Sequence, residues 1–338
     1  MIIIFSQELD ISTCDVIDWL DFYNVDFIRI NVDDEAQVKI RIFITEEKSR
    51  IAFDYKGTLF DLGTVSSYWY RRGGVLRLTK PIILHKILKS KKVLKEVQKD
   101  LWQEAKAITD FISQYLKNNV PHIGERESSF PNKLTMLQAA SNVGLKIPKT
   151  LITNSKKDIE EFKLNTGSII TKGVQESLHF SSEDCFYSVY TEEIQYVTDL
   201  PEYFHPSLFQ QKIEKKFEIR TFYIQGDFYS MAIFSQNDPQ TKIDFRKYNE
   251  KKPNRNVPFK LPHEIASKLT LFMKKMDMSS GSIDLVYTIS GQFVFLEVNP
   301  IGQFAMTSEP CNYYLERIIA NKLSQYELNK KSKSFPEA

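Results

Sequence analysis

The run Phe295-Leu-Glu-Val-Asn-Pro300, read together with Ser282 to Tyr287 before it, decides the fold of the C-terminal part of the chain. Ser282 to Tyr287 predicts one strand, and Gln292 to Val298 predicts a second. Gly291 lies between them and indicates a turn. The sequence therefore predicts a β-hairpin in this region.

Three oxygen-bearing side chains belong to this hairpin, Asp284, Glu297 and Asn299. Because side chains alternate between the two faces of a strand, Glu297 and Asn299 point the same way, and Asp284 can lie opposite them. Two carboxylates and an amide oxygen suit Mg²⁺ or Mn²⁺, hard cations that leave positions open for phosphate. The alternative is an exposed hairpin whose acids face water, and the rest of the sequence weighs against it.

Composition and charge limit the classes of protein to consider. The chain has 338 residues, of which 42% are hydrophobic and 13% aromatic, so we expect a folded protein of two or three subdomains. Its 45 Lys and Arg against 43 Asp and Glu argue against nucleic-acid binding, which normally needs a strong basic excess. The Lys-rich segment from Lys86 to Lys99 has Glu96 within it, which favours a solvated helix face.

The cysteines and the N-terminus favour a cytoplasmic protein. Cys14, Cys185 and Cys311 are odd in number and far apart, so we expect reduced thiols. The opening Met-Ile-Ile-Ile-Phe has no basic region before it and is followed by Glu8, which predicts a first strand and not a signal peptide. No run approaches the roughly 20 apolar residues of a membrane span, so no membrane association is expected.

The first part of the chain alternates strand and helix patterns, which predicts an α/β unit. Its expected elements are strands at Ile2 to Ser6, Phe27 to Asn31, Val38 to Thr45, Arg50 to Tyr55 and Ser67 to Arg72, a helix at Asp15 to Tyr23 and a long helix from Lys86 to Asn118. Pro121 and the loop to Pro131 close this unit.

Shorter β segments follow, with helices between them. A helix is expected from Asn132 to Ala140, ending at Gly144, and another from Pro262 to Met276. The expected strands are Ser168 to Lys172, Phe186 to Tyr190, Leu208 to Ile213, Glu218 to Gln225 and Phe228 to Ser235, the last two joined by the Gly226-Asp227 turn. We expect a loop from Gln236 to Pro258.

The chain contains neither G-x-x-x-x-G-K-[ST] nor G-x-G-x-x-G, so a glycine loop would not hold a nucleotide here. Two lysines are candidates instead. Lys133 lies in the first turn of its helix, and Lys172 ends the strand Ser-Ile-Ile-Thr-Lys. An ammonium group at either place could hold a phosphate as a point charge.

In this order, the segments resemble the ATP-grasp superfamily. The residues that carry the resemblance are Asn132-Lys133, Gly144 to Thr150, Ile170 to Gly173, Gln210 to Ile213, Glu218 to Arg220, Asp284 and Glu297 to Pro300. The interval of 13 residues from Asp284 to Glu297 fits the metal motif of that superfamily.

Within the superfamily the chain is most similar to the graspetide synthetases, the microviridin-type and grasp-with-spasm peptide maturases. Three phrases carry this similarity, Ser67 to Arg72, Ile213 to Arg220 and Asp244-Phe-Arg246. The first could equally be a strand with two structural salt bridges. The usual acidic residue for the adenine amino group is Gln211 here, whose side-chain oxygen can still accept that hydrogen bond.

The resemblance implies a role for each matching residue. Those that would bind ATP are Lys133 and Lys172 at the phosphates, Gln211 and the backbone of Lys212 and Ile213 at the adenine, and Glu218 at the ribose. Asp284, Glu297 and Asn299 would bind two Mg²⁺ ions, or Mn²⁺ in their place. Arg220 and Arg246 would be catalytic, acting on the transferring phosphoryl group; the alternative for each is a structural ion pair.

The implied fold is α/β (α+β) of the ATP-grasp type, with a nucleotide cleft between the central and C-terminal domains. We place an N-terminal domain at residues 1–120, a central subdomain at 121–205 and a C-terminal subdomain with the metal site at 206–328. Residues 329–338 are expected to be a disordered tail.

The implied activity is an ATP-dependent ligase that activates Asp or Glu side chains of a ribosomal precursor peptide and closes a macrocycle. Attack by Thr or Ser would give an ester and attack by Lys an amide, and both stay open at this point. One alternative is an ATP-grasp ligase that adds amino acids to a protein or a small acid. Another is a nucleotide-binding scaffold without turnover, against which the intact metal and lysine residues argue. Besides the precursor peptide, the favoured partner is a second copy, as a homodimer.

Overall fold

The computed structural model describes residues 1–34, 38–78, 90–174, 179–181, 186–188, 191–247 and 249–333, and at 179–181, 186–188 and 329–333 it describes the backbone alone. The chain divides into two compact units. Unit 1 comprises Met1–Ser129, Gln303–Ala305 and Tyr314–Ala338, and unit 2 comprises Phe130–Gly302 and Met306–Tyr313.

Unit 1 is an α/β unit built on a parallel sheet. Its elements are β1 (Ile2–Ser6), α1 (Ile11–Phe22), β2 (Phe27–Asn31), β3 (Lys39–Ile44), β4 (Ser49–Tyr55), β5 (Thr58–Asp61), η1 (Leu62–Thr64), β6 (Ser67–Tyr70), α3 (Lys91–Asn119), β7 (His122–Ile123) and α8 (Leu315–Lys333). The parallel sheet has the order β2-β1-β6-β7, and β3, β4 and β5 form a separate antiparallel sheet. Every residue of β1 is buried, as expected for a parallel strand covered on both faces.

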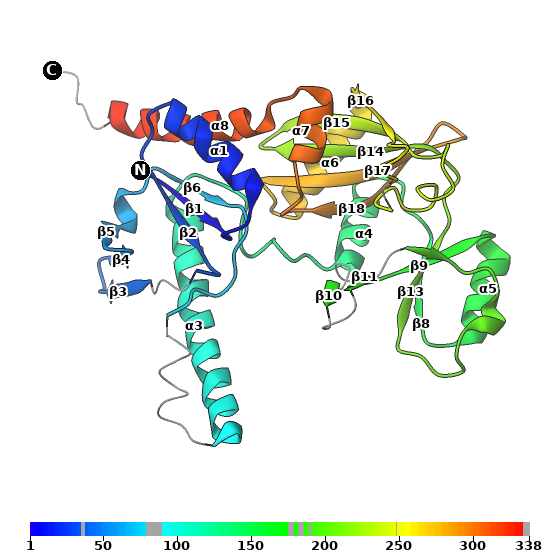
Figure 1. Cartoon of the computed structure of the whole chain (residues 1–338), viewed down its shortest axis with the longest axis horizontal. Helices are drawn as coiled ribbons and strands as arrows, with labels where there is room; N and C mark the ends of the chain where they lie inside the picture. Colours follow the sequence, from blue (N-terminus) through cyan, green and yellow to red (C-terminus); the bar gives the residue numbers. More distant parts are fainter. Residues whose placement is uncertain are drawn as a thin grey trace. The chain divides into compact units, whose positions relative to one another are not determined.

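Two sets of elements cover the parallel sheet. One hydrophobic cluster joins Ile3 and Phe5 of β1 to Phe53 of β4 and to Ile112 and Leu116 of α3. Helices α1 and α8 lie side by side, and α8 also contacts β1 and β6 (Figure 1). The apolar side chains of all these elements therefore enclose the sheet.

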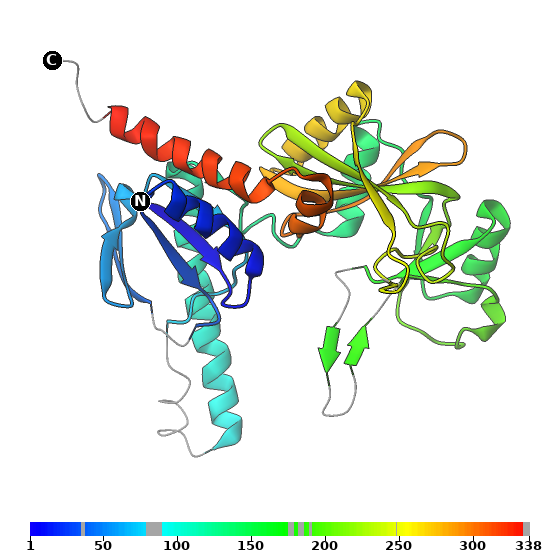
Figure 2. The same ribbon diagram turned by 45° about the horizontal axis from the view of Figure 1, so that its top comes forward.

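Unit 2 contains two larger β-sheets, and helices pack on each of them. Its elements are α4 (Lys133–Asn142), β8 (Thr150–Thr153), α5 (Lys156–Thr166), β9 (Ile169–Lys172), β10 (His179–Ser181), β11 (Phe186–Ser188), β12 (Glu192–Glu193), η2 (Val197–Asp199), β13 (Ser207–Gln211), β14 (Lys215–Ile224), β15 (Asp227–Phe234), β16 (Arg255–Phe259), α6 (His263–Lys275), β17 (Ser280–Thr288), β18 (Phe293–Asn299) and most of α7 (Ala305–Cys311). One sheet has the order β12-β9-β13-β8 and the other β16-β15-β14-β17-β18. Strands β10 and β11 pair with each other, apart from both sheets (Figure 2).

Alternation along the strands gives each sheet a core face and a second, more polar face. Helices α4 and α6 pack on the five-stranded sheet in a cluster that includes Ile219 of β14, Leu285 of β17 and Phe295 of β18. Helix α5 packs on the four-stranded sheet, where Ile159 meets Ile169 and Phe209. Because side chains alternate, the residues next to these core positions point to the opposite faces.

Several expectations need correction. Part of the expected loop from Gln236 to Pro258 belongs to β16, an edge strand in which Pro258 is tolerated because its nitrogen need not join the ladder. Elements that were not predicted from the sequence include β5, β7, β10, β12, α5, α7 and α8. The disordered tail is wrong for residues 329–333, which end α8, and α8 belongs to unit 1 instead of the C-terminal subdomain. Its buried Ile319 and Leu323 explain why it is helical and docked.

Other expected boundaries shift by a few residues. The long helix begins at Lys91, where the side chain of Ser90 accepts a hydrogen bond from the N–H of Val93. Residues 86–89, with which this helix was expected to start, lie outside the described residues. The same holds for residues 189–190 of the strand expected at 186–190. The metal hairpin extends from Ser280 to Asn299, as β17 and β18. Within the described part of the chain, no helix is both long and apolar enough to cross a membrane.

Candidate active site

Three charged side chains form a row across neighbouring strands of the five-stranded sheet. Arg220 of β14 lies opposite Asp284 of β17, and Asp284 lies opposite Glu297 of β18. The register of β18 against β17 shifts between Asp284 and Leu285, whose partners are Glu297 and Phe295, so Leu296 is the extra residue of a β-bulge. Bulges are common beside functional sites.

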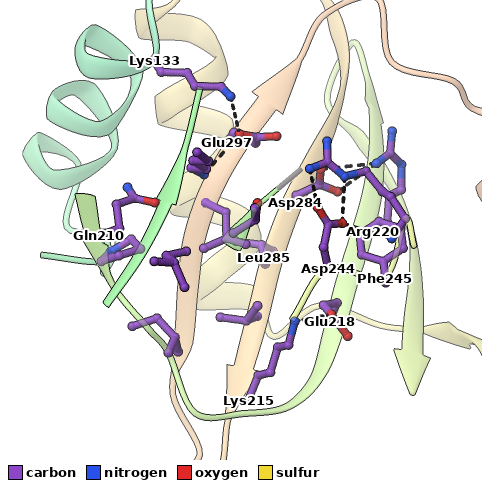
Figure 3. Close-up of a pocket in the computed structure, with 18 of the residues that line it drawn as sticks. Lys133, Gln210, Lys215, Glu218, Arg220, Asp244, Phe245, Asp284, Leu285 and Glu297 are labelled. Carbon is purple, nitrogen blue, oxygen red and sulfur yellow. Dashed lines mark hydrogen bonds and ion pairs between the residues drawn. The ribbon is translucent and has the colours of Figure 1, made fainter. Parts of the chain in front are cut away.

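Glu297 holds two lysines from different elements. Its Oε2 atom lies 3.3 Å from the Nζ of Lys133, the first residue of α4, and 3.4 Å from the Nζ of Lys172, the last residue of β9. Figure 3 shows Lys133 reaching Glu297 from α4. Burial alone would raise the pKa of Glu297, but the two lysines lower it to about 2. Burial lowers the pKa of Lys172, an effect that Glu297 opposes.

Asp284 is paired with a nearly buried arginine. The Nη1 atom of Arg220 lies 3.2 Å from Oδ1 and 3.3 Å from Oδ2 of Asp284. Burial raises the pKa of Asp284 above its ordinary value, although Arg220 opposes this effect. Two carboxylates, Asp284 and Glu297, therefore lie close together beside three cationic side chains, Arg220, Lys133 and Lys172.

Arg246 is held by the loop that precedes β16. The carboxylate of Asp244 accepts hydrogen bonds from Nε of Arg246 at 2.9 Å and from Nη2 at 2.6 Å, a bidentate pair. These bonds raise the pKa of Arg246, and although burial raises the pKa of Asp244, the bonds from Arg246 outweigh burial and lower it. Asp244 is buried, whereas the side chain of Arg246 is 45% exposed, so Asp244 anchors an arginine that still reaches the cavity.

Glu218 is buried beside the same cavity with partners on both oxygens. The Nζ of Lys215 donates to Oε1 at 2.5 Å, and the hydroxyl of Ser235 donates to Oε2 at 2.5 Å. Lys215 also donates to the carbonyl oxygen of Ile243 at 3.0 Å, which connects β14 to the loop that carries Arg246. Lys215 was not singled out in the sequence analysis, because a lysine at the start of a strand is ordinary by itself.

These residues surround a cavity of about 970 Å³. Both sheets of unit 2 contribute to its wall, together with the first turn of α4 and the loop before β16. All the site residues predicted from the sequence line it: Lys133, Lys172, Gln211, Lys212, Ile213, Glu218, Arg220, Arg246, Asp284, Glu297 and Asn299. The structure thus brings them together in one place, and their roles stay predictions.

Gln210, which belongs to a segment quoted for the resemblance but was given no role, is buried on β13 and lines the cavity. Its Nε2 donates to Oγ1 of Thr150 at 2.9 Å, and that hydroxyl donates to the carbonyl oxygen of Pro148 at 3.0 Å. Because the only hydroxyl hydrogen of Thr150 is used, Thr150 can only accept from the amide, and Oε1 of Gln210 is left as an acceptor. Thr150 faces Gln210 across β8 and β13, a register that the sequence does not state.

Some backbone N–H groups beside Gln210 already have hydrogen-bond partners within the protein. The N–H of Gln211 donates to the carbonyl oxygen of Lys149 at 2.9 Å, and that of Lys212 donates to the carbonyl oxygen of Ser168 at 2.8 Å. The expected use of Lys212 as a backbone contact is therefore restricted to its carbonyl oxygen. Among the described residues, the N–H of Ile213 has no hydrogen-bond partner, so an acceptor and a donor follow each other along this edge.

The oxygen atoms of the metal hairpin fit a hard cation. Oδ1 of Asn299 is buried and accepts no hydrogen bond from any described residue. Both lysines contact Oε2 of Glu297. No group of three or more His, Cys, Asp and Glu side chains able to hold a metal occurs in the described part of the chain. Two carboxylates and one amide would leave positions for phosphate oxygens.

Comparison with known proteins supports the fold. No protein-family model and no curated protein matches the chain. Solved structures do resemble it, several of them along nearly its whole length. A RiPP-associated ATP-grasp ligase from Chryseobacterium gregarium, in complex with ADP and a leader and core peptide, has a TM-score of 0.79 at 22% identity and covers 96% of each chain.

Two macrocyclases from Microcystis aeruginosa are also similar. MdnC, bound with the precursor peptide MdnA, has a TM-score of 0.73 at 23% identity, covering 96% of this chain and 99% of that one. MdnB has a TM-score of 0.71 at 22% identity, covering 95% of this chain and 98% of that one. Taken with the sheet order and the cavity between the two sheets of unit 2, these likenesses establish that the chain has the fold of the ATP-grasp ligases.

Proposed function

We propose that the protein is an ADP-forming ligase that uses ATP and Mg²⁺ to activate Asp or Glu side chains of a ribosomal precursor peptide and to close a macrocycle within that peptide. The observation that carries the proposal is the convergence of Lys133 and Lys172 on Glu297, beside the Arg220–Asp284 pair. A site that alternates cations and carboxylates in this way suits a polyphosphate and a divalent metal, which can exchange partners with both.

The cavity wall supports ATP as the nucleotide. Oε1 of Gln210 and the carbonyl oxygen of Lys212 are acceptors for the amino group of adenine, and the N–H of Ile213 is a donor for a ring nitrogen of adenine. Gln211 lines the same edge, as the resemblance implies. Guanine presents the opposite pattern, an oxygen where adenine has an amino group, so this edge favours adenine.

Polar groups farther along the cavity would hold the rest of the nucleotide. Glu218 would accept hydrogen bonds from the ribose hydroxyls, since each of its oxygens has one protein partner and retains a free lone pair. Lys133 and Lys172 would turn from Glu297 to the phosphates. Their side chains are 16% and 14% exposed, so the charges act where water screens them weakly.

Asp284, Glu297 and Asn299 would hold the metal, as two Mg²⁺ ions or Mn²⁺ in their place. The buried Oδ1 of Asn299, to which no described residue donates, supports this assignment. When bound, the metal supplies neutralisation of phosphate charge during phosphoryl transfer. Arg220 orients Asp284 for that task, because its Nη1 atom contacts both carboxylate oxygens.

The reaction has two steps. A carboxylate oxygen of the peptide attacks the γ-phosphorus of ATP, the bond to the β-phosphate oxygen breaks, and ADP leaves an acyl phosphate on the peptide. A Thr or Ser hydroxyl, or a Lys amine, then attacks the acyl carbon; phosphate leaves and the nucleophile loses its proton. Arg246 faces the cavity on a fixed anchor and would stabilise the charge on the moving phosphoryl group.

A peptide substrate is supported by the solved structures with the same fold. The Chryseobacterium gregarium ligase was solved with a leader and core peptide, and the macrocyclase MdnC with its precursor peptide. For this chain the precursor, a homodimeric assembly and a cytoplasmic location are parts of the proposal. The free thiols of Cys14 and Cys311 are compatible with that location, whereas Cys185 lies outside the described residues.

The test is co-expression with short peptides that contain Asp or Glu and Thr, Ser or Lys and that are encoded beside this protein. We expect one peptide to lose one water for each ring, with one ADP and one phosphate released per ring. A ligase that adds a free amino acid to the peptide would instead increase the mass of the peptide. Addition of an amino acid, or ATP binding without turnover, would contradict the proposal.

A further inference from the structure

Unit 1 contains a charged cluster that the proposed reaction does not use. Asp10 lies between two arginines, and its Oδ2 atom is 3.3 Å from Nε of Arg71 and 2.9 Å from Nε of Arg72. The strand expected from Ser67 to Arg72 ends at Tyr70. The two salt bridges of the alternative interpretation of this segment do form, both to this one aspartate. Within the described residues, two guanidinium groups share this one carboxylate, which gives Asp10, Arg71 and Arg72 together one excess positive charge.

The cluster lies where the topology of the sheet favours a ligand site. In the order β2-β1-β6-β7 the chain leaves β1 towards β2 on one side, while β6 pairs with β1 on the other. The point between β1 and β6 is therefore a switch point, and open parallel sheets bind ligands outside the carboxyl ends of the strands at such a point. Arg71 and Arg72 directly follow β6, and their N–H groups both donate to the carbonyl oxygen of Phe5, near the carboxyl end of β1.

The surroundings add positive potential. Asp10 is the N-cap of the 12-residue helix α1, but its side chain makes no capping hydrogen bond, because it is turned to the arginines. The positive end of the helix dipole is thus not capped by this carboxylate. Burial and the charge of Arg72 both lower the pKa of Arg71, to about 10, although Asp10 opposes them. A further anion would relieve this repulsion.

The two arginines differ in access. The side chains of Asp10 and Arg71 are each 4% exposed, and the guanidinium of Arg71 lies 5.5 Å from the ring centre of Phe304. The side chain of Arg72 is 33% exposed, and within the described residues its Nη groups contact no second acidic side chain. Asp10 and Arg71 are therefore buried residues that hold Arg72 in position, and the guanidinium group of Arg72 is accessible from solvent.

A stability role explains this arrangement poorly. Desolvating a buried ion pair costs about as much as its attraction returns, so such pairs add little net stability. A second arginine on the same carboxylate adds repulsion. From the switch point, the excess charge and the exposed edge, we infer that Arg72, positioned by Asp10 and Arg71, is a binding site for a carboxylate group. A planar guanidinium matches a carboxylate in a bidentate geometry.

The source of the carboxylate is an acidic side chain of the peptide substrate, a choice that rests on the proposed function. That Arg72 binds a carboxylate is inferred independently of the proposed function. A free phosphate would be attracted by the same charge, and the experiment separates the two.

The test is a titration of the full-length protein, labelled with nitrogen-15 in arginine, with glutarate as the probe for a glutamate-like carboxylate. The Nε–H resonance of Arg72 is identified as the one missing from Arg72→Gln. We expect it to shift saturably with glutarate and to respond less to inorganic phosphate. Neither nucleotide nor precursor peptide is needed, so loss of the proposed enzymatic activity would leave the result unchanged.

A second readout uses matched variants. Glutarate should raise the thermal midpoint of the wild-type protein and of Arg50→Gln, an exposed arginine on β4 of the same unit, whereas Arg72→Gln should bind about tenfold more weakly, the scale of one lost charge-assisted hydrogen bond. An unshifted Arg72 resonance, an equal response in Arg72→Gln, or a response to phosphate alone would overturn the inference.

Discussion

Replacing Glu297 with glutamine should destabilise the protein when metal and nucleotide are absent. In that state Glu297 is the shared partner of Lys133 and Lys172, at 3.3 and 3.4 Å. Glutamine keeps the shape but removes the charge, so two lysines with mostly buried side chains would face each other without their anion. Truncating one partner of a buried pair is costly for this reason.

The magnitude follows from the pKa of Glu297. The lysines hold it at about 2, against an ordinary value of 4.5, and at about 1.4 kcal/mol for each pKa unit the difference corresponds to roughly 3 kcal/mol. The side chain is 23% exposed, so water screens part of this energy. We expect Glu297→Gln to lower the free energy of unfolding by about 1 to 3 kcal/mol at neutral pH.

The stabilisation that Glu297 contributes should decrease as the pH falls. Because the pKa of Glu297 is lower in the folded protein, its contribution is complete above pH 4.5 and is lost as the pH falls towards about 2. The difference between wild type and Glu297→Gln should therefore be constant from neutral pH to about pH 5 and should narrow below it.

The assay is urea unfolding in EDTA at several pH values, with Glu264→Gln as the control. Glu264 also bonds a lysine, Lys268, at 2.6 Å, but its side chain is 75% exposed, so this variant should change the free energy of unfolding by no more than about 0.5 kcal/mol. Equal stability of wild type and Glu297→Gln at neutral pH, or a difference that widens on acidification, would refute the reasoning.

Four further predictions concern nucleotide and catalysis. Asp284→Asn should lower ADP release about 100-fold or more by weakening metal binding; normal release at ordinary Mg²⁺ concentrations would remove Asp284 from the metal site. Thr150→Val, which frees the amide of Gln210 to turn, should reduce the preference for ATP over GTP about tenfold, measured as the ratio of kcat/KM values; an unchanged ratio would separate Gln210 from base selection. Lys172→Ala should weaken ADP binding by about 1 to 2 kcal/mol in calorimetry, and unchanged affinity would place Lys172 outside the phosphate site. Arg246→Ala should bind ATP normally but lose turnover about 100-fold, whereas lost affinity with full turnover would assign Arg246 to nucleotide binding.

Local patterns in the sequence were enough for the metal hairpin. The interval between Asp284 and Glu297 fits strand, turn and strand, and the structure pairs these two residues directly across β17 and β18. Helix α4 was equally predictable, because Asn132 caps it by accepting from the N–H groups of Leu134 and Thr135. Each of these features depends on neighbours within a few residues.

Features that depend on distant contacts were missed. The bond between Gln210 and Thr150 joins residues 60 apart, and its existence depends on the register of β8 against β13. Likewise, α8 is stabilised by packing against α1 and β1 at the other end of the chain, which no local pattern states. The β-bulge at Leu296 is also invisible in the alternation of the strand.

The central claim is that ATP activates a peptide carboxylate by phosphoryl transfer. It is tested most directly with a cyclisable precursor whose Asp and Glu side-chain oxygens carry a heavy oxygen isotope. An acyl phosphate loses one of these oxygens to the departing phosphate, so mass spectrometry should find one labelled oxygen in the inorganic phosphate for each ring closed. Unlabelled phosphate, or label found in AMP because the carboxylate attacked the α-phosphorus, would contradict the account.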